Sequence, residues 1–212
     1  MSTEPREPIR TEVHRVADPE ATRVASYLAQ PGEVGRVLLL YSGGLDTSVM
    51  LKWIQDEYEA EVGALTVNLG QPGEDYDVVK GKALQLGAID CHVVDAREQF
   101  AHDFLVPAIK ANALYGGGYP LFTALGRPLI GKLGVEHARR TRCDTIAHGC
   151  TGKGNDQVRI ETTIATLAPE LKVIAPVRSW QMGRDEEIAY ARKHGIPAVS
   201  YTHLTLPTTP YV

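Results

Sequence analysis

The sequence predicts an α/β fold, in which a doubly wound, mainly parallel five-stranded sheet carries helices on both faces. Short apolar runs alternate along the chain with segments of helical periodicity. The apolar runs are continuous rather than alternating with polar residues, which is typical of strands buried on both faces. The stretches between successive runs are long enough to hold the crossover helix that parallel strands require.

The elements follow in a regular order. Strands are expected at residues 37–41, 62–69, 89–94, 145–148 and 172–175. Helices are expected at 46–58, at 77–86 with a stop at Gly87, from a capping box at 95–98 to Ile109, and at 128–141, 158–167 and 184–194. The glycine-rich run at 115–120 is expected to interrupt regular structure. Ligands of such sheets bind beyond the carboxyl ends of the strands, so the strand-to-helix loops are where a site is expected.

The chain divides into three parts. Residues 1–35 form an N-terminal extension, a polar arm followed by a short helix at 19–30 that Pro31-Gly32 closes. Residues 36–199 contain all the alternating strands and helices and form one α/β domain. Residues 200–212 change composition abruptly, with four threonines, two prolines and no Asp, Glu, Lys or Arg, so we interpret them as a non-native tail. The alternative is an extended native tail.

Composition excludes several classes of protein. The net charge of −4 leaves no basic footprint for nucleic acid or for an anionic membrane. No apolar stretch approaches the roughly 18 residues of a membrane span, and the first 31 residues show no secretory signal. Three cysteines without a C-x-x-C pair suit a reducing compartment, so a cytoplasmic protein is expected. The spacing of Cys143, His148 and Cys150 lacks a fourth zinc ligand, which favours buried thiols and a packed histidine.

The first candidate site is the loop after the first strand, which reads Ser-Gly-Gly-Leu-Asp-Thr-Ser at 42–48 and is called the first loop below. Two glycines allow a sharp turn and a close approach of the backbone to a ligand. Successive N–H groups at the start of the next helix then favour phosphate oxygens. Asp46 has the wrong charge for phosphate unless a cation lies between them, which indicates Mg²⁺. The alternative is an ordinary strand-to-helix turn with capping residues.

Two other phosphate motifs do not fit. The run at 126–132 has the spacing of a Walker A motif, but Leu133 stands where Ser or Thr should reach Mg²⁺. We interpret this match as a coincidence. The dinucleotide fingerprint G-x-G-x-x-G is absent after the first strand.

The second candidate site is the loop after the fourth strand, at residues 148–159, which is called the second loop. Three glycines keep its backbone open, and Asp156 and Arg159 share one helix face. An arginine can bind the carboxylate of an amino-acid ligand and an aspartate can bind its ammonium, while Thr151 and Asn155 would orient it. The alternative is a solvated helix cap with a surface ion pair.

Together the two loops closely resemble those of argininosuccinate synthases, within the ATP-pyrophosphatase (PP-loop) group. Four further segments also fit, at 68–71, 119–128, 174–176 and 194–197. The resemblance covers residues 36–199 and implies that they form a nucleotide-binding domain with an adenine-nucleotide alpha hydrolase-like fold. It departs at Ala124, where many members carry a serine that binds citrulline; Thr123 offers a hydroxyl next door.

The resemblance also implies roles for individual residues. ATP would be surrounded by Leu40, Tyr41, Ser42, Gly43, Gly44, Leu45, Asp46, Thr47, Ser48, Val67 and Gly149. Citrulline would be held by Tyr119, Asn155 and Arg159, and aspartate by Thr151, Asn155 and Asp156. Asp46 would contact Mg²⁺.

The activity that the resemblance implies is the ATP-dependent ligation of citrulline to aspartate. Citrulline attacks the α-phosphorus of ATP to give a citrulline-adenylate and pyrophosphate, and the amine of aspartate then displaces AMP. No side-chain nucleophile is needed, because the site has only to align reactants and stabilise charge. The family's synthetase domain and tetramer-forming arm are not in this sequence, so we expect the chain alone to bind nucleotide without completing the reaction.

Two other functions stay open. Another PP-loop ATP pyrophosphatase, such as a tRNA-thiolating or amidotransferase-coupled enzyme, would call for a catalytic cysteine pair, a basic surface or a glutaminase domain. A non-catalytic ATP-binding module would bind ATP with no dependence on citrulline.

Overall fold

The computed structural model describes residues 29–116, 118–151, 154–180 and 182–197. Its main sheet consists of β1 (Arg36–Leu40), β2 (Glu61–Asn68), β3 (Cys91–Asp95), β6 (Thr145–Ala147) and β7 (Lys172–Ile174). All pairings in this sheet are parallel, and the order is β3-β2-β1-β6-β7. The predicted fold class is confirmed. The expected arm, most of the helix at 19–30 and the tail at 200–212 lie outside the described residues.

The central strand β1 marks the point where the chain changes direction across the sheet. It pairs with β2 on one side and with β6 on the other, so that Leu38 lies between Gly63 and Ile146. The chain first runs outward from β1 to β3 and later returns to add β6 and β7 at the opposite edge. The loops that leave β1 and β6 therefore diverge to opposite faces, which creates a topological switch point between them.

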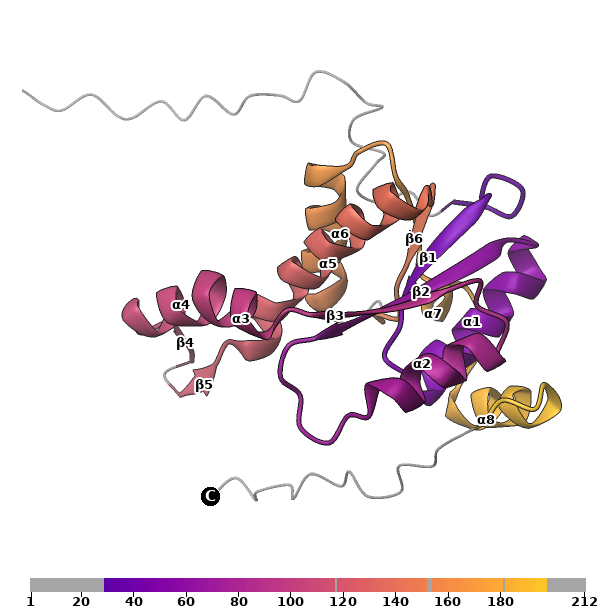
Figure 1. The fold of residues 1–212 in the computed structure, drawn as a ribbon, viewed down its shortest axis with the longest axis horizontal. Helices are drawn as coiled ribbons and strands as arrows, with labels where there is room; N and C mark the ends of the chain where they lie inside the picture. The colour runs from indigo at the N-terminus through magenta and orange to yellow at the C-terminus, as the bar shows by residue number, and fades with distance from the viewer. Residues whose placement is uncertain (1–28, 117, 152–153, 181, 198–212) are drawn as a thin grey trace, which may run out of the picture.

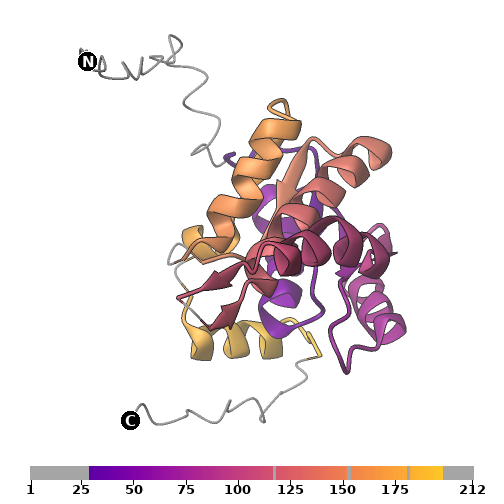
Figure 2. The same cartoon turned by 90° about the vertical axis from the view of Figure 1, so that its left-hand side faces the viewer.

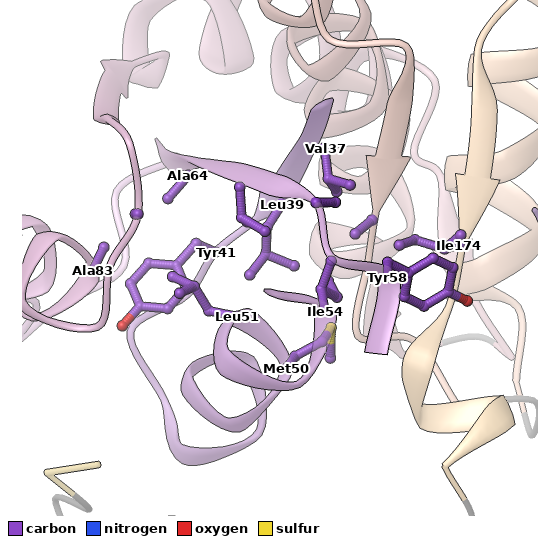
Figure 3. Packing of buried hydrophobic residues seen from close by; sticks show 14 of the residues in the cluster. Val37, Leu39, Tyr41, Met50, Leu51, Ile54, Tyr58, Ala64, Ala83 and Ile174 are labelled. Carbon is purple, nitrogen blue, oxygen red and sulfur yellow. The ribbon is translucent and has the colours of Figure 1, made fainter. Parts of the chain in front are cut away.

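Helices cover both faces of the sheet, because successive residues of each buried strand point to opposite sides. On one face, α1 (Leu45–Tyr58) and α2 (Tyr76–Gln85) share one buried apolar cluster with Val37 and Leu39. Figure 3 shows Met50, Leu51 and Ile54 of α1 directed at these strand residues. The opposite face carries α5 (Phe122–Thr141) and α6 (Asp156–Leu167), as Figure 1 shows. The helix α8 (Arg184–Lys193) packs on the outer side of α1.

Small residues let α5 approach its neighbours closely. A Cβ atom at Gly131 would lie 3.1 Å from Cβ of Thr163 in α6, and one at Gly134 would lie 3.2 Å from Cδ2 of Leu40 in β1. The run at 126–132 that resembles a Walker A motif is therefore part of a packed helix. Its amide groups bond along the helix and cannot surround a phosphate.

The segment between β3 and α5 differs from the prediction. It contains α3 (Arg97–Phe100), the π-helix η1 (Ala101–Leu105) and α4 (Val106–Lys110). The predicted capping box is wrong: Ala96 is the N-cap residue and makes no side-chain cap bond. Asp95 instead pairs with the side chain of Arg97, at 2.6 Å, and accepts from its backbone N–H. Asp95 therefore lies one residue before the N-cap and binds the first residue of α3 through both its side chain and its backbone N–H.

Three further differences concern turns and helix starts. The run at 115–120 does not merely interrupt structure, because β4 (Leu114–Tyr115) and β5 (Tyr119–Pro120) form a small antiparallel hairpin beside α3 and α4 (Figure 2). The helix expected to begin at 128 begins at Phe122 and contains Pro128. A short helix, α7 (Pro176–Ser179), follows β7 and was not predicted.

The predicted stop of α2 at Gly87 is confirmed, since Gly87 has a φ of 90° directly after the C-cap residue of α2.

Candidate functional site

A cleft of about 450 Å³ lies at the carboxyl ends of β1 and β2 and beside the segment that leaves β6. Most of the residues predicted to surround ATP line it: Leu40, Tyr41, Ser42, Gly44, Leu45, Asp46, Thr47, Val67 and Gly149. Leu65 and Ile130 add apolar surface from the same hydrophobic cluster as Val67, whereas the first loop supplies polar groups. The cleft thus combines an apolar part with a loop rich in hydrogen-bonding groups, as small-molecule sites usually do.

The first loop is held together by its own hydroxyl groups. Ser42 Oγ and Thr47 Oγ1 are 3.1 Å apart, and Ser48 Oγ donates to the carbonyl of Gly44 at 2.7 Å. Ser48 is fully buried and also bonds to the hydroxyl of Tyr41, at 3.0 Å. Ser48 therefore shapes the loop from inside, and neither it nor Gly43 lines the cleft.

Several backbone amides of the first loop remain free to bind a ligand. Ser48 donates to the carbonyl of Gly44, as the helix pattern requires, and Gly44 N–H makes a long bond of 3.4 Å to Ser42 Oγ. The N–H groups of Leu45, Asp46 and Thr47 begin α1 and have no acceptor among the described residues. These three residues line the cleft. Unpaired amides at a helix start are suited to an anion.

The two predicted loops are in contact. A Cβ atom at Gly149 would lie 3.0 Å from Cε of Met50 and 3.7 Å from Cγ2 of Thr47, so the chain after β6 packs directly on the first turns of α1. Glycine at this position allows the approach. Both loops lie at the same sheet edge, as their positions after buried strands predict, and both contribute residues to one cleft.

The exposed carboxylate of Asp46 has a cationic partner from α8. Arg184 Nη1 lies 2.5 Å from Asp46 Oδ1 and 3.5 Å from the carboxylate of Glu187. Burial, followed by the nearby charge of Asp46, raises the pKa of Glu187 to about 7. Arg184 lines the cleft, so the mouth beside the first loop carries a guanidinium as well as the predicted carboxylate.

Among the residues predicted to bind amino acids, Asp156 and Arg159 lie beside the cleft and are not part of its lining. Asp156 accepts from Arg127 Nε at 3.0 Å and from Arg159 Nη1 at 3.1 Å, so one carboxylate joins two arginines. Arg127 lines the cleft and links this cluster to it. Asn155 is the N-cap residue of α6 and is exposed, as is Thr151. Tyr119 belongs to β5, and its side chain is outside the described part of the structure.

A buried polar network fixes the start of the second loop. His148 is 1% exposed, and its Nδ1 accepts from the backbone N–H of Cys150 at 3.2 Å. The other ring nitrogen, Nε2, therefore carries the proton and donates to Glu161 at 3.0 Å. Burial alone would raise the pKa of Glu161, but the bond from His148 and the charge of Arg178, 2.5 Å away, hold it below its usual value. This network holds Gly149 and Cys150 against the cleft.

The expectation of buried thiols holds for Cys143, whereas Cys150 is only half-buried and lines the cleft. Cys91 and Cys143 are buried, and burial raises the pKa of the Cys91 thiol to about 11, so it stays protonated. Within the described ranges, no cluster of three or more His, Cys, Asp or Glu side chains could hold a metal ion. No helix in that part of the chain is long and apolar enough to cross a membrane.

Sequence reasoning assigned no role to several residues of the cleft. The lining also includes Gln71, Glu74, Tyr76, Arg127 and Arg184. Gln71 and Arg127 fall in segments that carried the family resemblance, so they could have been proposed from it. Arg184 begins α8, more than 130 residues from Asp46 in the sequence, and only the packing of α8 on α1 brings the two together.

A parallel sheet with a glycine-rich loop after its central strand, and a cleft at its switch point, defines an α/β nucleotide-binding domain. Comparison with known families gives the particular assignment. The family described as "Arginosuccinate synthase N-terminal HUP domain" matches residues 36–197. The chain therefore belongs to the argininosuccinate synthase family, as its two loops indicated.

Curated relatives agree with this assignment. The chain is 64% identical over 162 residues to the argininosuccinate synthase of Rubrobacter xylanophilus, a match that covers 76% of this chain and 39% of that protein. It is 53% identical to the argininosuccinate synthase of Oceanobacillus iheyensis over the same shares of the two chains. The chain thus spans about two fifths of the length of these relatives.

Solved structures show the same fold at low sequence identity. One is a 4-thiouridine synthetase in complex with RNA and bound ATP, with a TM-score of 0.54 and 14% identity, covering 76% of this chain and 41% of that one. Another is the U34-tRNA thiolase NcsA of Methanococcus maripaludis, with a TM-score of 0.50 and 18% identity, covering 85% and 63%. At such identities the likeness concerns the fold alone.

Proposed function

We propose that this chain is the ATP-binding domain of an enzyme that ligates citrulline to aspartate, with release of AMP and pyrophosphate. The observation that carries the proposal is the family match over residues 36–197, which contains both loops of the cleft. The chain would work together with the remaining part of such an enzyme, in a cytoplasmic homotetramer. ATP, citrulline and aspartate are the proposed substrates.

The two ends of the cleft suit the two parts of ATP. The apolar end near Leu40, Val67 and Ile130 would take the adenine ring. The polyphosphate would then lie along the first loop, where the N–H groups of residues 45–47 are unpaired among the described residues. The positive end of the α1 dipole adds roughly 0.3–1 kcal/mol for an anion at this position.

Magnesium fits the oxygen ligands that the first loop offers, provided that the phosphates of ATP complete its coordination. Asp46 supplies one carboxylate, and Ser42 and Thr47 supply hydroxyl oxygens on the same loop. Since Mg²⁺ commonly takes one or two carboxylates together with substrate phosphates, ATP itself would provide further ligands. Asp46 would then exchange its present partner, Arg184, for the metal. The metal would neutralise polyphosphate charge.

The second loop and α6 would hold the amino acids. Arg159 would bind the carboxylate of citrulline, with Tyr119 and Asn155 placing its backbone. Thr151, Asn155 and Asp156 would bind aspartate; to receive its ammonium, Asp156 would have to share the carboxylate that now joins Arg127 and Arg159. These groups would align the ureido oxygen of citrulline with the α-phosphorus and later present the amine, so that positioning supplies most of the catalysis.

The test is an assay of pyrophosphate release. Residues 1–197 would be joined to the C-terminal part of the Rubrobacter relative, which is the part that this chain does not match. We expect pyrophosphate release only when ATP and citrulline are both present, and argininosuccinate only when aspartate is added. Release that ignores citrulline would refute the proposed substrate and leave a nucleotide-binding module. Release that requires tRNA would indicate another PP-loop enzyme instead.

A further inference from the structure

Lys82 is a buried cation beneath the first loop. It lies on α2, its residue is 8% exposed, and its ammonium donates to the carbonyl of Gly43 at 2.9 Å. Neither Lys82 nor Gly43 lines the cleft, so the contact supports the loop from behind. The family resemblance gives this lysine no role.

The charge of Lys82 has no counter-ion in the described structure. No carboxylate of the described residues lies within ion-pair distance of its ammonium, and burial lowers its pKa. By contrast, the buried carboxyl of Glu187 has Arg184 at 3.5 Å, and the half-buried carboxyl of Glu161 has both His148 and Arg178. A buried ammonium without an opposite charge lowers the stability of the folded protein. A bound anionic ligand would supply the missing negative charge.

Packing fixes Lys82 in register with the loop. Val79 stands one turn earlier on the same face of α2, and its Cγ2 lies 2.8 Å from where a Cβ atom of Gly43 would be. Gly43 has a φ of 79°, a conformation that glycine adopts without strain. Val79 and Lys82 thus both contact the loop at Gly43. The next residue of α2, Ala83, belongs to the same buried cluster as Tyr41 and Leu51 (Figure 3).

We propose that Lys82 is a positioning residue for the first loop and that its positive charge is balanced by the polyphosphate of the bound nucleotide. This inference rests on the proposed binding of ATP. The hydrogen bond to Gly43 orients the turn that presents the free amides, and the charge attracts phosphate through the loop. The effect should grow with the charge of the ligand: large for ATP and pyrophosphate, small for AMP.

The experiment measures binding of ATP, pyrophosphate and AMP by calorimetric titration of the full 212-residue chain. Lys82→Met removes the charge and the hydrogen bond, Lys82→Gln keeps a donor without the charge, and Lys82→Arg keeps the charge. Lys80→Met is the matched control, because Lys80 is exposed on the same helix. We expect Lys82→Met and Lys82→Gln to weaken ATP and pyrophosphate binding about 10- to 100-fold, the range for losing a charged hydrogen bond.

The remaining readouts separate positioning from structural support. AMP binding should change less than about threefold, Lys82→Arg should recover most of the affinity for ATP, and Lys80→Met should match the unsubstituted chain. Without ligand, Lys82→Met should unfold at the same or a higher temperature, because the uncompensated charge is gone. The inference is overturned if Lys82→Gln binds ATP normally, or if ATP and AMP weaken equally. An unsubstituted chain that binds no ATP would instead remove the proposed function on which the inference rests.

Discussion

At Gly43, two constraints act on a single residue of the first loop. Its φ of 79° is unfavourable for any residue with a side chain, and Val79 occupies the space that a Cβ atom would need. Gly43→Ala should therefore destabilise the fold by about 2–4 kcal/mol, combining backbone strain with overpacking. Chemical denaturation measures this change, and ATP affinity should fall with it because the loop is displaced.

Gly32 supplies the matched control for this prediction. It has a φ of 88°, but nothing lies within 4 Å of its Cβ position. Gly32→Ala should cost only the strain, about 1–2 kcal/mol. In addition, Gly43→Ala should cost less when Val79 is already alanine, because the clash is relieved. Equal penalties at both glycines would mean that the contact with Val79 does not matter.

His137 predicts a pH dependence that arises away from the cleft. Burial, followed by the charges of His92 and Arg140, lowers the pKa of His137 to about 4, and its Nε2 has no described partner. Between pH 6.5 and 4, His137 is protonated in the unfolded chain but stays neutral in the folded chain. Stability should therefore fall as pH drops through this window, by at most about 1.4 kcal/mol per pH unit from this residue.

The check compares the free energy of unfolding across that window in two variants. His137→Gln cannot take up the proton, so its stability should depend less on pH than that of the unsubstituted chain. His102→Gln, which changes an exposed histidine, should leave the slope unchanged. A slope that survives in His137→Gln would assign the dependence to other groups.

Individual site residues were predictable where local sequence creates the chemistry. The first loop has its glycines, hydroxyls and helix start within seven residues, and all of its cleft-lining members were named in advance. Lys82, Arg184 and the His148–Glu161 bond could not be found in this way. Each depends on two segments of the chain that meet only in the packed fold, and no spacing in the sequence encodes those contacts.

At the scale of elements, glycines in two helices should respond oppositely to alanine. A Cβ atom at Gly131 of α5 would lie 3.1 Å from Cβ of Thr163 and 3.4 Å from the carbonyl of Ile160, neither of which is a flexible end. Gly131→Ala should destabilise by about 1–3 kcal/mol despite its better helix propensity. Gly81→Ala in α2 meets nothing within 4 Å and should stabilise by about 0.5–1 kcal/mol.

Thermal and chemical unfolding of the two variants tests this contrast. The opposite signs matter more than the sizes, since both substitutions carry the same intrinsic gain. If Gly131→Ala were as stable as Gly81→Ala, α5 and α6 would have room for the added methyl group, and the predicted clash with Thr163 would be wrong.

The elements of the sheet were predictable because burial on both faces leaves a strong signal. Each of the five strands was found within two residues of its bounds. Errors fall where a local signal competes with packing. Pro128 suggested a helix start, but α5 begins earlier, at Phe122, and keeps the proline inside. Asp95 and Glu98 match a capping box, but the N-cap residue is Ala96, one residue later. Asp95 binds both the side chain and the backbone N–H of Arg97.

For the whole molecule, contacts close the fold at both ends of the described chain. Ala29 N–H donates to the carbonyl of Val173 at the far edge of the sheet, and its own carbonyl accepts from Tyr58 of α1. At the other end, Ile196 is buried with Leu45 and Val49 of the same helix. The segment from 29 to 197 therefore contains the apolar clusters on both faces of the sheet, together with the contacts of Ala29 and Ile196 at its two ends.

A chain of residues 29–197 should accordingly unfold in a single transition, with a Tm within about 2 °C of that of residues 1–212. Because the whole cleft lies inside this segment, ATP at 100 times its Kd should add about 2.7 kcal/mol to both chains. For a domain of this size, that raises the Tm by roughly 5–10 °C. Scanning calorimetry with and without Mg²⁺-ATP makes the comparison. A shorter chain that melts much earlier, or that ATP stabilises less than the longer one, would mean that residues outside 29–197 belong to the core or to the nucleotide site.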